Sequence, residues 1–230
     1  MEYFTFDGTP STYYNAYLAK SNMFDAPKRD ITSVTVPGRN GVLHLDNGRY
    51  ESFKAKCTVY IPKNMQNTID DLRNFLLSKG SCEYRESWRS GEFRKAVFID
   101  AFVVTESDRQ GSVFDLTWEC SPERYLDSGD TFETVSSSFE LVNPTLMDAY
   151  PIIEVEGTGT LSFGGTELTL STNTGTAVID SEMQDAYEGA INRNPYLTMT
   201  NGFPVLTAGN NAGTFTGFSA VRIKPRWWML

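Results

Sequence analysis

The sequence predicts a mainly β protein with two domains: an N-terminal β domain that contains one amphipathic α-helix, residues 1–126, and a C-terminal β-sandwich, residues 127–230. Three observations support this prediction. Aromatic residues, which favour strands, make up 13% of the chain. Alternating polar and apolar runs, bounded by Gly, Pro and Asn, recur along its length. A single segment, near residues 65–79, has apolar residues at helical spacing.

The boundary between the two domains is predicted from residues 116–129, LTWECSPERYLDSG. Leu116, Trp118 and Cys120 fall on one face of an expected strand. Pro122 ends that strand because it has no N–H to donate to a sheet. The polar segment that follows, residues 127–138, is interpreted as a hinge.

In the first domain, VPGRNG at 36–41 is expected to be a loop, and Asp46-Asn47-Gly48 to be the turn of a hairpin between strands 42–45 and 50–61. Asn64 or Asn67 is expected to cap the helix. The apolar stripe of that helix, which favours packing on the sheet over binding a partner, consists of Met65, Ile69, Leu72, Phe75 and Leu76.

Residues 84–95, YRESWRSGEFRK, are the most basic part of an acidic chain. They are interpreted as a hairpin-like arm, and two alternatives remain open for it. The arm is either simply solvated or protrudes to contact a neighbouring subunit, since interfaces favour Arg, Trp and Tyr. The candidate interface residues are Arg85, Trp88, Arg89 and Arg94.

The second domain shows short expected strands at short intervals, which is typical of a β-sandwich. They lie at 152–156, 159–163, 167–170, 176–179, 196–199, 213–216 and 220–223. Residues 180–194 are expected to form a long polar loop. The apolar end, with Trp227 and Trp228, is expected to pack against the fold or a partner.

Composition argues against several kinds of chemistry. The net charge of −9 disfavours nonspecific binding to nucleic acid or to an anionic membrane. Three cysteines without a CxxC motif suggest neither zinc nor a disulfide framework. His44 is the only histidine, and the carboxylates of Glu154 and Glu156 are more simply explained as a solvated strand face. We therefore expect no catalytic, cofactor-binding or metal-binding residues and no enzyme activity, in a chain that folds in a cytosol without a signal peptide or membrane span.

Seven segments, taken together and in order, resemble the distal tail protein (Dit) family of siphovirus-type phages. They are FDGTPS at 6–11, VPGRNG at 36–41, YRESWRSGEFRKAVF at 84–98, FDLTWECSPERYLDSG at 114–129, NPTLMDAYPIIEVEGTGTLSF at 143–163, VIDSEMQDAYEGAINRN at 178–194 and FPVLTAGNNAGTFTGFSAVRIKPRW at 203–227. Each segment is weak alone, but their common order spans nearly the whole chain.

The resemblance implies a virion protein at the distal end of the tail, assembled in the host cytoplasm. Its N-terminal domains would form a homo-hexameric ring, and its C-terminal domain would be galectin-like. The ring would join the tail tube protein to the tail-associated tip protein and to receptor-binding or other baseplate proteins, and the genome would pass through it without specific binding. The alternative is a carbohydrate-binding module that attaches to host cell-wall polysaccharide.

Overall fold

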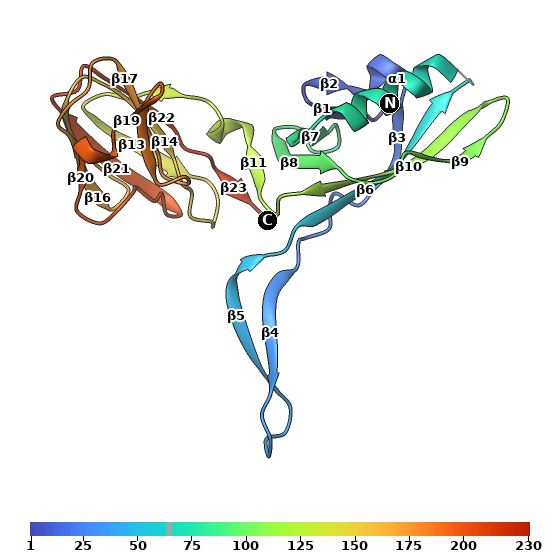
Figure 1. Ribbon diagram of the computed structural model, residues 1–230, viewed down its shortest axis with the longest axis horizontal. Coiled ribbons are helices and arrows are strands. Elements are labelled where there is room, and N and C mark those ends of the chain that lie inside the picture. Colours follow the sequence, from blue (N-terminus) through green and yellow to red (C-terminus); the bar gives the residue numbers. More distant parts are fainter. Residues whose placement is uncertain (64–65) are drawn as a thin grey trace. The chain divides into compact units, whose positions relative to one another are not determined.

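The computed structural model describes residues 1–63 and 66–230 and divides the chain into two compact units. The first unit comprises Met1–Arg124 together with Leu230, and the second comprises Tyr125–Met229. Strands predominate in both, and the described residues contain one α-helix. The predicted fold class, mainly β with one helix, is therefore confirmed (Figure 1).

The first unit is built on an antiparallel sheet whose strand order is β2-β1-β7-β8-β10-β6-β3, with β9 paired to the free half of β10. β10 is central because its C-terminal half pairs with β8 while its whole length pairs with β6. The strands are β1 (Phe4–Phe6), β2 (Thr9–Pro10), β3 (Tyr17–Ser21), β4 (Arg29–Thr35), β5 (Val42–Tyr50), β6 (Phe53–Pro62), β7 (Cys82–Glu86), β8 (Glu92–Phe98), β9 (Val103–Ser107), β10 (Gly111–Cys120) and β11 (Arg124–Leu126).

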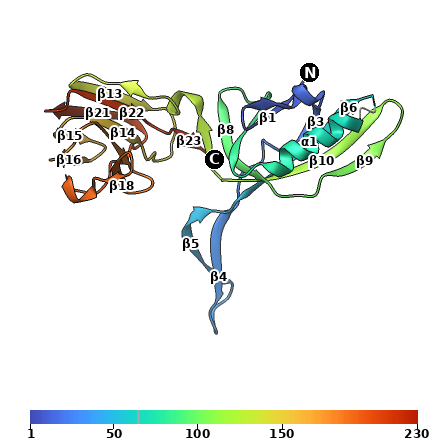
Figure 2. The same ribbon diagram turned by 45° about the horizontal axis from the view of Figure 1, so that its top comes forward.

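Helix α1 (Gln66–Ser78) covers one face of this sheet (Figure 2). Leu72 and Leu76 are fully buried, and Phe75 packs against the same core, as the helical stripe predicts. Asn67 lies within the helix rather than before it. The other expected cap, Asn64, and the first stripe residue, Met65, fall outside the described residues.

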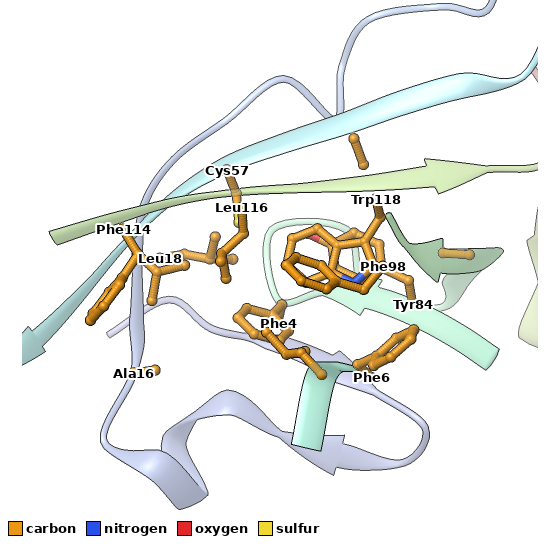
Figure 3. Close-up of a cluster of buried hydrophobic side chains, with 14 of the residues drawn as sticks. Phe4, Phe6, Ala16, Leu18, Cys57, Tyr84, Phe98, Phe114, Leu116 and Trp118 are labelled. Atoms are coloured by element: carbon orange, nitrogen blue, oxygen red, sulfur yellow. The ribbon is translucent and has the colours of Figure 1, made fainter. Parts of the chain in front are cut away.

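Trp118 occupies the centre of the core of the first unit (Figure 3). Its ring centroid lies 4.6 Å from that of Tyr84, 5.1 Å from that of Phe4 and 5.6 Å from that of Phe98. These partners come from β7, β1 and β8, so one side chain joins strands that are far apart in the sequence. Such aromatic pairs stabilise a core beyond the area that they bury.

The hairpin predicted around Asp46-Asn47-Gly48 is a correction. Strand β5 runs straight through these residues and pairs with β4, and the chain reverses instead at residues 36–41. Gly38 and Gly41 both have φ of +80° there, a conformation that glycine adopts without strain. Gly48, with φ of +71°, lies in a stretch where the pairing register shifts, so the Asn-Gly signal marks an irregularity and not a turn.

The second unit is a sandwich of two antiparallel sheets, ordered β12-β22-β14-β17-β18-β19 and β13-β21-β15-β16-β20. Its core contains Ile153, Val155, Leu161, Leu168 and Val221. The strands are β12 (Glu133–Thr134), β13 (Ser138–Asn143), β14 (Ile152–Glu156), β15 (Gly159–Phe163), β16 (Thr166–Leu170), β17 (Thr176–Asp180), β18 (Asp185–Glu188), β19 (Ile191–Asn192), β20 (Leu197–Met199), β21 (Gly209–Thr216), β22 (Ala220–Lys224) and β23 (Trp228–Met229).

Two segments expected to be irregular belong to this sandwich. The proposed hinge, residues 127–138, contains a short 3-10 helix and strand β12, which pairs with β22. The expected loop, residues 180–194, contains β18 and β19. Buried Arg193 donates from Nε to the Glu188 carboxylate at 2.8 Å, and this pair holds the polar segment in place.

Candidate interaction surfaces

The segment predicted to be a protruding basic arm, residues 84–95, instead lies within the main sheet of the first unit. β7 pairs with β1 and β8, and only residues 87–91 form the turn between β7 and β8. The four candidate residues are therefore not equivalent. Arg85 is half-buried above the ring of Phe93, with 4.7 Å between its guanidinium carbon and the ring centroid.

Arg94 is buried, which corrects its assignment to an exposed arm. Its side chain is 5% exposed and donates from Nη1 to the main-chain oxygens of Ser121 and Pro122, at 3.1 and 2.6 Å. Its guanidinium carbon lies 4.5 Å from the centroid of the Phe53 ring. Arg94 thus binds the chain that follows β10 and presents no surface to a neighbour.

Trp88 and Arg89 remain at the surface, where they meet a residue that sequence reasoning missed. The guanidinium carbon of Arg89 lies 4.6 Å from the ring centroid of Phe24, which is 67% exposed. Trp88 is 36% exposed, and Arg89 also pairs with Glu92 at 3.2 Å. We call Phe24, Trp88 and Arg89 the Arg–aromatic patch. No local signal identifies Phe24, because it lies more than 60 residues earlier in the chain.

The hairpin of β4 and β5 is the second candidate surface, and its strands pair with no other strand (Figure 1). Val34 lies directly opposite Leu43, and Leu45 lies opposite Thr32, so these side chains share one face. Val34, Leu43 and Leu45 are 38%, 37% and 48% exposed. We call these three residues the apolar hairpin face. An isolated two-stranded hairpin with exposed aliphatic side chains is marginally stable in water, so a partner that covers this face would stabilise it.

The opposite face of the hairpin contains a Ser–His pair that does not form a catalytic site. The Oγ of Ser33 and the Nδ1 of His44 are 3.1 Å apart, but both residues are exposed. Asp46, on the same face, is paired with Arg29 at 3.3 Å and accepts the Gly48 N–H, so it does not orient the imidazole.

Other groups with possible chemistry are also structural. Cys57 and Cys120 are buried as predicted, and burial raises the pKa of the Cys120 thiol to about 11. Glu154, on the solvated face of β14, pairs with Arg222 at 2.8 Å. Across residues 1–63 and 66–230, no group of three or more His, Cys, Asp or Glu side chains is placed to hold a metal ion. No helix in the same ranges is long and apolar enough to cross a membrane.

The terminal tryptophans, considered as a sugar-stacking pair, are engaged by the fold. Trp227 is 5% exposed in the core of the second unit. Half-buried Trp228 donates from Nε1 to the main-chain oxygen of Asp148 at 2.9 Å. This pair therefore offers no open aromatic platform.

Comparison with known proteins was made by sequence and by structure. The sequence matches no protein-family model, and no curated protein matches it. The solved structure of the phage SPP1 Dit protein (gp 19.1), described as a paradigm of the hub adsorption apparatus in phages that infect Gram-positive bacteria, matches with a TM-score of 0.75 and 15% identity over 100% of both chains. Two structures of the phage P2 baseplate in its activated conformation, with Ca and with Sr, match with TM-scores of 0.56 and 0.54 and 9% identity, over 98% of this chain and 97% of theirs.

The chain therefore has the fold of phage hub and baseplate proteins. Within that class, it shares its fold over its full length with Dit, so the resemblance inferred from the sequence is confirmed at the level of the fold.

Proposed function

We propose that this chain is a structural virion protein, a distal tail protein that forms a hexameric ring at the end of a phage tail. The ring would connect the tail tube protein to the tail-associated tip protein and to baseplate or receptor-binding proteins. The observation that supports this proposal most strongly is the fold shared with the SPP1 hub protein over the entire length of both chains. The role is structural, and no step of it requires a catalytic residue.

The apolar hairpin face gives the proposed ring a physical basis. A cyclic ring needs a heterologous contact, in which one patch meets a different patch on the next copy. A hairpin that leaves three aliphatic side chains exposed on one face is suited to such a contact, because burying them removes apolar surface from water.

Self-association tests this proposal. We expect light scattering on the full chain to give about six times the monomer mass of 25.8 kDa. Replacing Val34 by Asp and Leu43 by Lys together should return the mass to that of one copy. The two new charges lie directly opposite each other, so the hairpin keeps a favourable cross-strand pair while its apolar face is lost.

The matched control makes the same pair of changes on the other face, at Ser33 (to Asp) and His44 (to Lys), which also lie directly opposite each other. This variant should keep the mass of the unmodified chain. A monomer at every concentration of the unmodified chain would contradict self-assembly into a ring, and equal masses for both variants would exclude the apolar hairpin face as the contact.

The Arg–aromatic patch is proposed as a second contact, to a neighbouring subunit or ring, with Arg85 beside it and Arg94 supporting it from inside. Removing Trp88 and Arg89 together by alanine substitution should raise the concentration at which the assembly dissociates by about tenfold or more, since exposed Trp and Arg are the usual hot spots of interfaces. Dilution followed by mass measurement checks this. Arg73→Ala, which removes an exposed helix residue paired with Asp70, is the control and should leave that concentration unchanged.

A further inference from the structure

A buried arginine without an ionic partner is the least expected feature of the first unit. Arg94 is 5% exposed, yet its hydrogen bonds go to two neutral main-chain oxygens, and no carboxylate lies within ion-pair distance of it in the described part of the chain. Its Nη2 has no hydrogen-bond partner there. Burial lowers the pKa of the Arg94 guanidinium. A buried cation is normally paired because removing a charge from water is costly.

A second arginine next to the same cavity also has a donor without a partner. Arg124 is 9% exposed and pairs with Glu92 at 3.1 Å, but its Nε has no hydrogen-bond partner in the described ranges. Glu92 is shared, because it also pairs with Arg89. One carboxylate thus serves two guanidinium groups while Arg94 has none, which leaves an excess of positive charge at this place.

The two donors face a common space. Arg94 and Arg124 line a small cavity together with Arg85, Phe53 and Phe93. Its volume is about 10 Å³, which is about the minimum for one water-sized occupant and too small for a carboxylate or phosphate group. Two phenylalanine rings and the guanidinium groups make the walls apolar but electropositive, an environment that favours a weakly hydrated anion over a water molecule.

We propose that this cavity binds one monatomic halide ion, chloride under physiological conditions, between the side chains of Arg94 and Arg124. The bound ion completes the hydrogen bonding of Arg94 Nη2 and Arg124 Nε and neutralises the excess positive charge. It thereby stabilises the junction of β8 with the chain segment 121–124. The inference is independent of the proposed ring, because every residue in it belongs to the first unit of a single chain.

Thermal unfolding of the full chain tests the proposal. The protein is kept at constant pH and ionic strength while sodium gluconate, whose anion is too large for the cavity, is replaced stepwise by sodium chloride or bromide. Because a ligand that binds only the folded state stabilises it, the melting temperature should rise by roughly 3–6 °C at ten times the dissociation constant. Arg94→Met should abolish the difference between halide and gluconate.

Arg49→Met is the matched control, because Arg49 is exposed on the β4–β5 hairpin and pairs with Asp30 at 2.6 Å. It should retain the full halide effect. Crystals grown in sodium bromide give a second readout that needs no variant: an anomalous peak is expected within contact of Arg94 Nη2 and Arg124 Nε. If Arg94→Met does not fold, the bromide position decides. A melting temperature independent of halide, with water alone in the cavity, would overturn the proposal.

Discussion

Trp118→Ala is expected to destabilise the first unit by about 3–5 kcal/mol, the range for truncating a fully buried aromatic side chain. Trp118 is 0% exposed and contacts the rings of Phe4, Tyr84 and Phe98 from three different strands. Its removal leaves a cavity where β1, β7 and β8 meet β10, and those strands cannot collapse into it without losing their pairing. Urea unfolding followed by circular dichroism measures the loss.

Two controls make this prediction specific. Trp118→Phe should cost less, about 1–2 kcal/mol, because the ring contacts are largely kept and the indole N–H has no hydrogen-bond partner among the described residues. Trp88→Ala, at the surface, should change the unfolding free energy by less than about 0.5 kcal/mol. Similar losses for Trp118→Ala and Trp88→Ala would show that the ring cluster is not the centre of the core.

Asp180→Asn is expected to destabilise the second unit by about 3 kcal/mol, because it leaves a guanidinium without its buried partner. Asp180 is 2% exposed. Its two carboxylate oxygens accept from the Nη1 and Nη2 atoms of Arg226 at 2.8 and 2.9 Å, and Oδ1 also accepts the N–H groups of Glu182 and Met183. The asparagine side chain keeps the shape but loses one acceptor and the charge.

The same site gives a pH dependence of defined sign. Burial alone would raise the pKa of Asp180, but the hydrogen bonds from Arg226 and from the two N–H groups bring it below its ordinary value of 3.8. A lowered pKa in the folded state favours folding above the pKa of the unfolded chain. This contribution is therefore complete above about pH 5 and is lost as the pH falls below 3.8.

Unfolding free energies measured at several pH values check this prediction. Asp180→Asn should lack the part of the acid destabilisation that this carboxylate causes in the unmodified chain. The control is Glu154→Gln, which removes a partly exposed ion pair with Arg222 and should cost less than about 1 kcal/mol. If both variants cost the same, Asp180 does not contribute as a buried ion pair.

Local patterns predicted most of the strands because each pattern is read within a few residues. The alternation of Phe53, Ala55 and Cys57 on β6 and of Leu116 and Trp118 on β10 places the same side chains in the core. The register between those two strands, with Trp118 opposite Ala55, depends on pairing across about 60 residues. That pairing is a property of the whole sheet, and no short segment encodes it.

The candidate surfaces were less predictable for the same reason. A charged segment with Arg94 looks like a solvated arm until the neighbouring strands bury it and the carbonyls of Ser121 and Pro122 bind its guanidinium. Phe24 gains significance only because Arg89 stacks on it. The apolar hairpin face was missed because Asn47-Gly48 suggested a turn, and a turn at that position separates Leu45 from its true partner, Thr32.

The order of strands in the first unit makes its folding wait for the ribosome. β6 lies between β3 and β10, and β1 lies between β2 and β7, so each early strand needs a neighbour that is synthesised much later. Trp118, the centre of the core, is added almost at the end of the unit. A nascent chain that has not yet reached residue 120 therefore exposes both the core face of β6 and the apolar hairpin face. During this interval chaperones, or strands of another nascent chain, compete with correct folding.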